Sequence, residues 1–418
     1  MILSEQHIFT RGSKAFREFE TLCRNANNLY NATMYRVRQS FFTGKILTYP
    51  EVNKQFIKEK QVDYYSLPTK ISQQVQRNVA AAWKSYFREI KDYKKNPSKY
   101  QGKPNIPGYR EKGGFSIVPF TIQSISFNNR NVKKGFLKLS ETSVLIKTNL
   151  KEIQAARLVP IDRNHIKVEI LYNVECPEVR NNGRIASIDL GVNNLATIVY
   201  PNSRTEIING RPLKSMNQYY NKKLAEIRSK NAKREHQIRR EVSLISKRRN
   251  KINDYLHKAS RYILNQLVSN DVTELVIGYN AGWKQDIKMG RVGHSRKEGN
   301  QRFQFIPFLK FISMLIYKCT LAGIMVTTNE ESYTSKCSFL DNEEVCQHEE
   351  YKGKRVKRGL FRASNGRLIN ADVNGALNIL KKYLDLEKVV RNKEKILNSL
   401  DLIEVCSTPA VYTVKLAA

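Results

Sequence analysis

The sequence predicts a multidomain protein of mixed α+β architecture, and three patterns carry that prediction. Residues 13 to about 93 repeat apolar side chains at i, i+3 and i+4, the spacing of amphipathic helices. Residues 115–176 instead alternate apolar and polar side chains in short runs between turn residues, as antiparallel strands do. From residue 184 onward, strand-like apolar runs alternate with helical patterns, which is the order of an α/β domain. The chain's 418 residues suffice for about two to four domains.

The first part of the chain begins with a strand and continues as a helical region. The opening segment MILSEQHIF is expected to form a strand that completes the antiparallel sheet or small barrel of residues 115–176. A segment rich in Pro, Gly and Lys, residues 96–114, ends the helices. The helical periodicity assigns five side chains to a helix-bundle core, namely Tyr30, Val75, Val79, Trp83 and Phe87.

The second part of the chain alternates strands and helices. Residues 184–200 predict two strands joined by a Gly-Asn turn, and a long polar helical pair follows at 217–268. The later elements are, in order, a strand at 274–280, an apolar helix at 305–323, a strand at 324–330, a basic loop at 332–367 and a helix at 370–384. The tail beyond that helix carries a short helical pattern and the segment VCSTPAVYTVKLAA, to which the pattern assigns no role.

The charge of the chain points to a polyanionic partner. The formal net charge is +34, from 72 Lys and Arg against 38 Asp and Glu. Nucleic acid is the usual partner of so basic a protein, because each cation docked on a phosphate releases condensed counterions. The alternative, an anionic membrane surface, requires a basic amphipathic helix with an apolar face. We find no apolar run of about eighteen residues and no signal peptide, so we expect a cytoplasmic, nucleoid-associated protein without membrane contact. Six scattered cysteines fit reduced thiols.

Two helical stretches concentrate side chains suited to nucleic acid. Residues 222–251 contain twelve Lys and Arg against three Glu, which favours phosphate contact over an ordinary solvated helix face. The candidates there are Lys233, Arg234, Arg239, Arg240, Lys247, Arg248 and Arg249. On the polar side of an earlier helix, a second group could touch DNA, although its pattern alone is that of a solvated face. This group consists of Lys70, Gln73, Gln74 and Arg77.

Two aspartates stand where phosphodiester chemistry would place them. Asp189 lies within the apolar run IASIDL, and a buried carboxylate is costly unless it is hydrogen-bonded or binds a cation. Asp372 opens the last predicted helix. Each has an ordinary alternative, since Asp189 could cap the turn that follows it and Asp372 could be a helix N-cap. Together they favour a site for two Mg²⁺ ions about 3.5–4 Å apart, with Mn²⁺ as a substitute.

Four motifs carry a resemblance to a known family. IASIDLGVNNLAT, VIGYNAGWKQ, ESYTSKCSF and NADVNGALNI resemble, in this order, the RuvC motifs of TnpB, the OrfB-type transposon-encoded RNA-guided nucleases related to type V CRISPR effectors. The resemblance extends from near Leu67 to Leu380, most of the chain. It implies a monomer with a guide RNA from the transposon end. It also implies Mg-dependent cleavage of double-stranded target DNA beside a short adjacent motif, which the helix residues 70–77 would read.

The same resemblance implies a domain plan. An N-terminal wedge β-barrel is interrupted by a helical recognition lobe, and an RNase H-like (RuvC) α/β domain with a target-nucleic-acid-binding insertion follows. On this sequence the plan gives the wedge barrel residues 1–12 and 106–181, the recognition lobe 13–105, the RuvC domain 182–331 and 366–385, the insertion 332–365, and a C-terminal tail 386–418.

The third carboxylate of the family pattern is displaced. That pattern has Glu where Gly278 stands, and glycine offers no side chain to a metal. In an RNase H-like sheet the strand ending at Asn329 lies beside the strand ending at Gly278, about 4.8 Å away. A Glu side chain spans roughly this distance, so we expect Glu331, with Glu330 as the alternate, to complete the catalytic and metal site with the two aspartates. The ordinary alternative is that both glutamates are surface acids.

The zinc pattern of the family is also incomplete. Cys337 matches its first ligand, but Leu340 stands at the second position. Cys337, Cys346 and His348 supply at most three N or S ligands where a structural zinc uses four, so we expect no structural zinc. The same segment is basic and is expected to clamp nucleic acid instead, through residues that include Lys354, Arg355, Lys357 and Arg358.

Three functions are therefore compared. An RNA-guided DNA endonuclease accounts for the motifs, the charge and the carboxylates. A nuclease-inactive RNA-guided DNA-binding protein, acting as a repressor, would keep every basic surface and lose only the chemistry, as Gly278 allows. A cut-and-paste transposase could use the same metal fold, but nothing in the sequence resembles a dedicated end-recognition domain.

Overall fold

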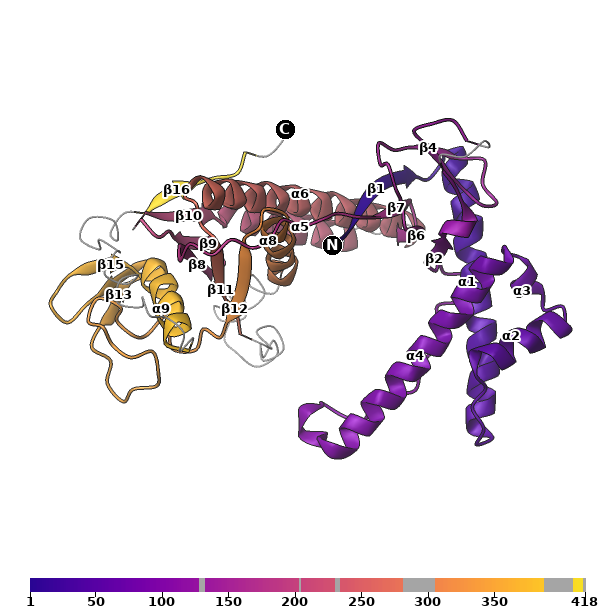
Figure 1. Ribbon diagram of the computed structural model, residues 1–418, viewed down its shortest axis with the longest axis horizontal. Helices are drawn as coiled ribbons and strands as arrows, with labels where there is room; N and C mark the ends of the chain where they lie inside the picture. The colour runs from indigo at the N-terminus through magenta and orange to yellow at the C-terminus, as the bar shows by residue number, and fades with distance from the viewer. Residues whose placement is uncertain (128–131, 203, 230–233, 281–304, 387–408, 416–418) are drawn as a thin grey trace. The chain divides into compact units, whose positions relative to one another are not determined.

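A computed structural model describes residues 1–127, 132–202, 204–229, 234–280, 305–386 and 409–415, with the side chains of residues 234, 235 and 386 excepted (Figure 1). The chain separates into two compact units, Met1–Val174 and Glu175–Ala418. Each unit has its own hydrophobic core, and the two are described in turn.

The helices of the first unit form the region that the apolar periodicity predicted. They are α1 (Lys14–Phe42), α2 (Tyr49–Lys58), α3 (Val62–Tyr65) and α4 (Thr69–Lys95), followed by the 3₁₀ turn η1 (Pro97–Lys99). Ser13 begins α1 because its side-chain oxygen accepts a hydrogen bond from the backbone N–H of Phe16. The Pro- and Gly-rich residues that follow η1 hold no helix or strand before Val118.

The predicted helix-bundle core is largely confirmed. Tyr30, Val75, Val79 and Trp83 are buried, but Phe87 is 39% exposed. The prediction for Phe87 is wrong because α4 has no buried residue after Trp83, and its C-terminal part extends away from α1 (Figure 1). The apolar repeat of α4 therefore continues past Trp83 into a part of the helix that has no buried residue.

The strands of the first unit form two antiparallel sheets. They are β1 (Ile2–Thr10), β2 (Val118–Thr121), β3 (Ile125–Phe127), β4 (Phe136–Leu139), β5 (Leu145–Lys147), β6 (Ala155–Asp162) and β7 (His165–Asn173), with the turn η2 (Ile122–Ser124) after β2. The sheet orders are β1-β7-β6-β2 and β3-β4-β5. The opening strand does complete the antiparallel sheet, because β1 pairs with β7 from Ile2↔Asn173 to Thr10↔His165.

The second unit is built on one six-stranded mixed sheet with the order β12-β11-β8-β9-β10-β16. Its strands are β8 (Ile185–Leu190), β9 (Asn194–Val199), β10 (Thr205–Asn209), β11 (Glu274–Gly278), β12 (Met325–Asn329) and β16 (Ala410–Tyr412). Its helices are α5 (Arg211–Ser229), α6 (Arg234–Ser269), α8 (Phe308–Leu321) and α9 (Ala371–Leu386). The strands and helices expected between residues 184 and 384 are confirmed, and β10 and β16 are additions to the predicted order. The short helical pattern expected in the tail lies outside the described residues.

Helices cover both faces of this sheet. Ala186, Ile188 and Leu190 of β8 pack with α6 and α8, whereas Ile185 of the same strand packs with α9. Successive side chains of a strand point to opposite faces, so Asp189 shares the α9 face with Ile185. The fold thus directs Asp189 toward the helix that carries Asp372.

The segment expected to be a basic loop contains a small sheet. Strands β13 (Lys354–Lys357), β14 (Leu360–Arg362) and β15 (Leu368–Asn370) pair antiparallel in that order. Phe361 and Ile369 are buried and pack against α9, which explains how so polar a segment forms strands. The strand that pairs with β14, β13, is fully exposed and largely basic, and this concealed the sheet in the sequence.

Two further expectations concern membrane contact and the state of the cysteines. Over the described residues, no helix combines the length and apolar character needed to cross a membrane. Cys23, Cys176, Cys319, Cys337 and Cys346 are free thiols, and Cys406 lies outside the described residues.

Candidate active site and nucleic-acid interface

Three parallel strand ends place the predicted carboxylates together. Strand β11 pairs in parallel with β8 on one side and with β12 on the other. Ile277 lies opposite Ile188, and Gly278 lies opposite Asn329. Asp189 follows Ile188 directly, and Glu331 comes two residues after Asn329. The predicted adjacency of the strands ending at Gly278 and Asn329 is therefore confirmed.

A glycine in α9 makes room for the Asp189 carboxylate. A Cβ atom at Gly375 would lie 2.8 Å from Oδ2 of Asp189, so any larger residue would displace that carboxylate. Nearby, the Ser187 hydroxyl donates to the carbonyl of Ala376 at 2.7 Å, which ties β8 to α9. Gly375 was not recognised from the sequence, although its position three residues after Asp372 in NADVNGAL was the available signal.

Gly278 makes room for Glu331 in a similar way. A Cβ atom there would lie 3.0 Å from Oε2 of Glu331 and would overlap the side chain of Ile379. The Glu331 backbone N–H donates to Oδ1 of Asn280 at 3.0 Å, which fixes the chain as it leaves β12. The Glu331 side chain thus lies where the family's own glutamate would begin.

Glu330 lies in a different environment. Its side chain is 53% exposed and forms an ion pair with Lys382 of α9. It also accepts a hydrogen bond from the backbone N–H of Ser332 at 2.9 Å. These contacts hold Glu330 as a surface acid, the ordinary alternative considered for both glutamates.

Asp372 is not the N-cap of α9. The Asn370 side-chain oxygen accepts hydrogen bonds from the backbone N–H groups of Asp372 at 2.9 Å and Val373 at 3.2 Å, so Asn370 fills that role. The Asp372 carboxylate instead accepts from Nδ2 of Asn194 at 2.5 Å and faces Nη2 of Arg355 at 3.5 Å. The side chain of Asp372 is therefore available to the strand ends rather than to its own helix.

The carboxylates share one electrostatic environment. Burial raises the pKa of Asp189 well above its ordinary value, and the neighbouring charges of Glu331 and Asp372 raise it further. The Arg355 guanidinium and the backbone N–H of Leu190 act in the opposite direction on this pKa. Among the described residues, no three His, Cys, Asp or Glu side chains are grouped closely enough to hold a metal ion. Binding a shared cation would require the three carboxylates to draw closer together.

Basic residues of the insertion lie beside these carboxylates. Arg355 belongs to β13 and reaches Asp372, and the Arg358 guanidinium faces the side-chain amide of Asn193 in the turn between β8 and β9. Lys354 and Lys357 are exposed on the same strand. Asn193 and Asn194 were read from the sequence only as turn residues, and their side chains connect the turn to the site.

The cysteine-containing part of the insertion is held by hydrogen bonds. The Cys337 thiol donates to the carbonyl of Cys346 at 3.5 Å, and Sγ of Cys346 lies 3.4 Å from Nε2 of His348. The buried carboxylate of Glu343 accepts from the backbone N–H groups of Ser338 at 2.7 Å and Lys352 at 2.9 Å. These contacts define the loop conformation.

Helix α9 fastens this loop with its own side chains. Nδ2 of Asn374 and Nδ2 of Asn378 donate to the carbonyl of Cys337 at 2.8 Å and 2.7 Å. Nζ of Lys381 donates to the carbonyl of Glu343 at 2.9 Å. The acceptors are backbone groups of the loop, which any sequence there would supply.

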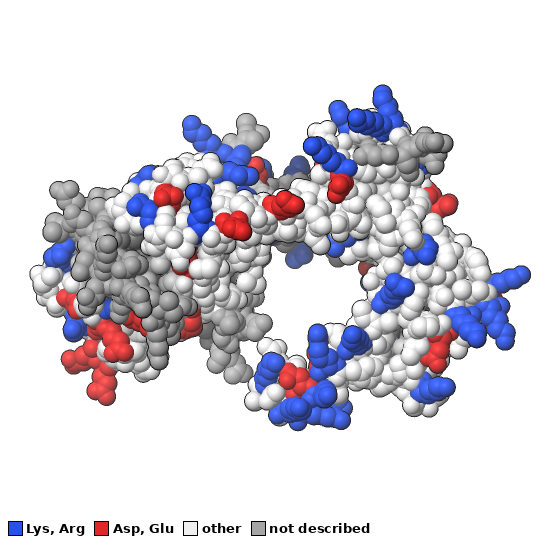
Figure 2. Space-filling view, in the orientation of Figure 1, with Lys and Arg blue, Asp and Glu red and all other residues white. Residues whose placement is uncertain are grey.

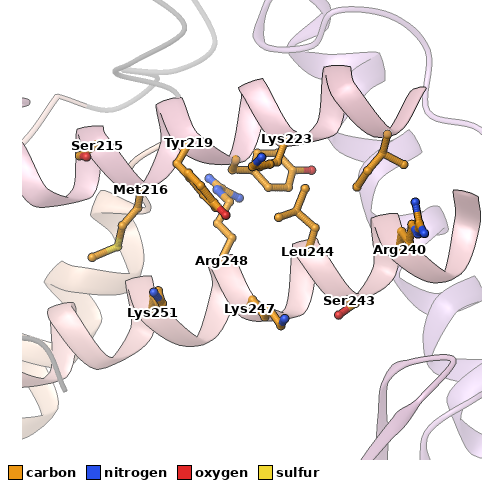
Figure 3. A pocket seen from close by; sticks show the side chains of 12 residues that line it. Ser215, Met216, Tyr219, Lys223, Arg240, Ser243, Leu244, Lys247, Arg248 and Lys251 are labelled. Atoms are coloured by element: carbon orange, nitrogen blue, oxygen red, sulfur yellow. The ribbon is translucent and has the colours of Figure 1, made fainter. Parts of the chain in front are cut away.

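The basic helical pair encloses a cavity of about 700 Å³ between α5 and α6. Tyr219 of α5 and Arg248 of α6 point toward one another across it (Figure 3). Burial lowers the pKa of Arg248, whose guanidinium donates to Oδ1 of Asn217 at 2.7 Å and to the carbonyl of Phe305 at 3.2 Å. Arg248 thus helps to hold the helical pair together as well as lining the cavity.

The other basic candidates of this pair differ in exposure. Arg239, Arg240 and Lys247 are exposed and Arg249 is half-buried. Lys233 and the side chain of Arg234 lie outside the described residues. Two ion pairs, Lys223–Glu226 at 2.8 Å and Arg228–Glu241 at 3.1 Å, engage two of the three Glu in this stretch, so most of its Lys and Arg still have no acidic residue to oppose them in the count.

The candidates on α4 lie on one side of the first unit. Lys70 and Arg77 are exposed, and Gln73 and Gln74 are half-buried. The Arg77 guanidinium lies over the ring of Tyr49, 5.1 Å from its centroid. Further along, Lys and Arg side chains gather over the C-terminal end of α4 (Figure 2).

Comparisons with known proteins match most of the chain. Residues 165–284 match the family model OrfB_IS605, described as a probable transposase, and residues 308–379 match the Cas12f1-like TNB domain. A TnpB-like protein, ORF457, of Acidianus two-tailed virus is 24% identical over 406 residues, which cover 88% of this chain and 83% of that protein. The CRISPR-associated endodeoxyribonuclease Cas12f2 of Micrarchaeota archaeon (strain CG1_02_47_40) is 27% identical over 236 residues, 53% of this chain and 41% of that protein.

Two solved structures are also similar. One is a Cas12f1–sgRNA–target DNA complex, with 16% identity, a TM-score of 0.36 and coverage of 90% of this chain and 98% of that chain. The other is a CRISPR-Cas12f ternary complex, with 13% identity, a TM-score of 0.35 and coverage of 88% and 82%.

Proposed function

Because the chain is a TnpB-type protein, we propose that it is a transposon-encoded, RNA-guided DNA endonuclease. It cleaves double-stranded DNA matched to its guide RNA beside a short adjacent motif, and it depends on magnesium. The observation that carries this proposal is that Asp189 of β8 and Glu331 after β12, on either side of β11, lie near enough to Asp372 in the first turn of α9 for the three charges to interact. The name of one relative, an endodeoxyribonuclease, supports the same chemistry.

The chemistry of the three carboxylates suits an oxygen-liganded divalent cation, which would bind once they draw closer together. Gly278 and Gly375 leave the space that the Glu331 and Asp189 side chains occupy. Burial, and after it the charges of Glu331 and Asp372, raise the pKa of Asp189, and a bound cation would offset both effects. Asp189, Glu331 and Asp372 would hold two Mg²⁺ ions, with Mn²⁺ as a substitute. When bound, the ions supply an activated water and stabilise the leaving oxygen of the phosphodiester.

The basic groups next to the site bind the substrate strand. Arg355 and Arg358 present planar guanidinium groups at the edge of the carboxylate cluster, where they can grip a phosphate and orient it. Lys354 and Lys357 extend that surface. When a phosphate engages Arg355, the Asp372 carboxylate loses its ion-pair partner and is free to act with Asp189.

The remaining basic surfaces hold the guide RNA and the target. The α5–α6 pair binds RNA phosphates through its exposed cations, and the surface of α4 around Lys70 and Arg77 reads the DNA motif with Gln73 and Gln74. The domain plan is part of this proposal: a wedge barrel from the strands of the first unit, a recognition lobe from α1 to α4, and a RuvC domain on the six-stranded sheet.

The test begins with the RNA. The protein is expressed with its flanking DNA, the bound RNA is sequenced, and plasmids that match its guide segment are incubated with the complex and Mg²⁺. We expect cleavage only of matched plasmids that carry a defined adjacent motif, and RNA association that weakens steeply with salt. Protein that cleaves DNA without any RNA would contradict the proposal. Gln73→Ala with Gln74→Ala should relax the motif preference while leaving RNA binding intact.

The second candidate function is a nuclease-inactive RNA-guided DNA-binding protein that represses transcription. Two observations favour it, namely the glycine at position 278 and the separation of the three carboxylates among the described residues. A wild-type complex that binds a matched target but never cleaves it with Mg²⁺ or Mn²⁺ would establish this function and exclude the nuclease.

A further inference from the structure

A second cavity, of about 360 Å³, lies among the helices of the first unit. It is enclosed by α1, α2, α4 and the segment before α2, and its volume falls within the roughly 300–1,000 Å³ of small-ligand pockets. The exposed residues Thr48, Lys84 and Phe87 belong to its lining, so the cavity reaches the surface. Most of the residues in its wall are apolar.

Three buried polar side chains line this cavity. Gln76, Thr33 and Trp83 are 1%, 2% and 3% exposed. Both amide atoms of Gln76, the Thr33 hydroxyl and the indole N–H of Trp83 have no hydrogen-bond partner among the described residues. Buried polar groups are almost always paired, so the cavity contains donors and an acceptor that a ligand would satisfy.

Aromatic rings form another part of the cavity wall. The Trp83 ring is stacked on Phe87, with centroids 5.8 Å apart and planes 29° apart, and it also contacts Phe41 at 5.0 Å. Tyr49 lines the cavity from α2. Flat aromatic walls combined with an amide and an indole N–H favour a planar ligand with hydrogen-bonding edges.

A row of cations on α4 passes the mouth of the cavity. Lys70, Arg77, Lys84 and Lys91 are all exposed and follow one another at seven-residue intervals, so they lie along one face of the helix. Lys84 belongs to both the row and the cavity lining. A phosphate backbone bound along this row would bring its bases to the cavity.

We propose that this cavity receives one unpaired nucleobase of a nucleic acid bound along α4. The base is held between aromatic and apolar walls, with its edge hydrogen-bonded to Gln76 and Trp83, while its phosphates contact the cation row. An aliphatic side chain would leave the Gln76 amide unpaired, whereas a base edge satisfies it. This inference rests on the proposed binding of nucleic acid, and the base can come from the RNA or from the DNA.

The experiment uses Trp83 as its own reporter. The sequence has two tryptophans, Trp83 and Trp283, so Trp283→Phe leaves emission from the cavity alone. The full-length variant, freed of RNA at high salt, is titrated at low salt with single-stranded RNA and DNA dodecamers and with the same lengths built of abasic sugars. We expect base-containing strands to quench Trp83 emission and abasic strands to bind without quenching it. Quenching by RNA only, or by DNA only, identifies the source of the base.

Two neighbouring alanines provide a matched pair of variants. Ala80 lines the cavity, whereas Ala81 is exposed on the same helix and lies outside the lining. Ala80→Leu should abolish the quenching and weaken binding of base-containing strands roughly 5- to 100-fold, and Ala81→Leu should behave as wild type. Gln76→Met keeps the length of the side chain and removes its amide, so it should retain stacking but weaken binding, and it serves as the second variant if Ala80→Leu fails to fold.

The outcomes separate this inference from the function it rests on. If no oligonucleotide binds at low salt, the proposed nucleic-acid binding fails, and this inference fails with it. If oligonucleotides bind and Trp83 emission is unchanged, or if Ala80→Leu and Ala81→Leu bind them equally, the base pocket is overturned while the proposed function stands.

Discussion

Two faces of helix α9 contact the rest of the second unit in different ways. One face meets the strand ends, where Gly375 accommodates the Asp189 carboxylate and Ile379 packs over Gly278. The other face meets the insertion, where Asn374 and Asn378 donate to the backbone carbonyl of Cys337. On the first face the chemistry depends on which side chains are present. On the second face most partners are backbone groups, which survive a change of sequence in the loop; Lys381 also donates to a loop side chain, Asn342.

This difference explains how the chain tolerates two departures from its family pattern. The loss of the glutamate at position 278 is tolerable for a nuclease only if another carboxylate fills the same space, which is the role proposed for Glu331. The missing zinc ligands need no such replacement, because hydrogen bonds from α9 and Glu343 already hold the loop. The comparison therefore predicts large functional effects on the strand face and moderate stability effects on the loop face.

The largest effects are expected from the carboxylates themselves. Asp189→Ala, Asp372→Ala and Glu331→Gln should each reduce cleavage of a matched plasmid by roughly 10²–10³-fold or more, because each removes a carboxylate that would hold the metal ions. Guided DNA binding, measured by filter retention of the same target, should stay near wild type. Glu330→Gln is the matched control and should have a mild effect. Full cleavage by both the Glu330 and the Glu331 variants would place the third carboxylate elsewhere.

The glycines of the strand face come next. Gly278→Ala and Gly375→Ala insert a Cβ atom against Ile379 and Glu331, or against Asp189, and should reduce cleavage by about tenfold or more while costing roughly 1–3 kcal/mol of unfolding free energy. Gly108→Ala is the control, since a Cβ atom at Gly108 meets no atom within 4 Å. Normal cleavage by the Gly278 variant would show that the Glu331 side chain does not use that space.

Smaller effects are expected on the loop face. Asn378→Ala removes the buried donor of the Thr334 carbonyl and leaves the Cys337 carbonyl with Asn374 alone, so the unfolding free energy should fall by roughly 1–3 kcal/mol in chemical denaturation. Cys346→Ser, which alters a loop side chain instead of a helix side chain, should change it by less than about 0.5 kcal/mol. A larger loss of unfolding free energy in Cys346→Ser than in Asn378→Ala would contradict this difference between the two faces.

The smallest effect concerns zinc. Metal analysis of the purified protein should find no stoichiometric zinc, and treatment with a chelator should leave its melting temperature unchanged, because Cys337, Cys346 and His348 lack a fourth ligand in the family pattern. A different result would be one tightly held Zn²⁺ per chain whose removal by a chelator lowers the melting temperature. It would show that the loop depends on the identity of its side chains.

The spacing of apolar residues predicted most of the helices and strands. It could not predict contacts between residues that lie far apart in the sequence. The strand and helix of IASIDL and NADVNGAL follow from periodicity, and the adjacency of the Gly278 and Asn329 strands followed from the resemblance and is confirmed by their pairing. The role of Gly375 depends on a carboxylate 186 positions earlier in the chain, which no local pattern encodes. Phe87 was misplaced because the period of a helix continues whether or not another element covers it.

The missed strands have a related cause. Strand β16 contains three residues, pairs in parallel with β10 and stacks Tyr412 on Tyr262. Its stability comes from an edge supplied by residues about two hundred positions earlier, so its short sequence carries no strand signal of its own. The sequence did not predict strand β13 because its side chains are exposed and largely basic. Such charge indicates a loop, and the segment is too short to show the alternation of a strand.

The contacts of α9 follow the strands of the sheet in order. Gly375 meets β8 at Asp189, Ile379 meets β11 at Gly278, and Lys382 meets Glu330 beyond β12. Steps of three or four residues advance a helix by about 4.5–6 Å, close to the roughly 4.8 Å between strands, so one helical residue is available for each strand. Inserting a single residue after Asp372 would rotate the rest of α9 by about 100° relative to that aspartate and misalign every one of these pairs at once. The register of α9 between Asp372 and Lys382 is therefore fixed by the spacing of the strands.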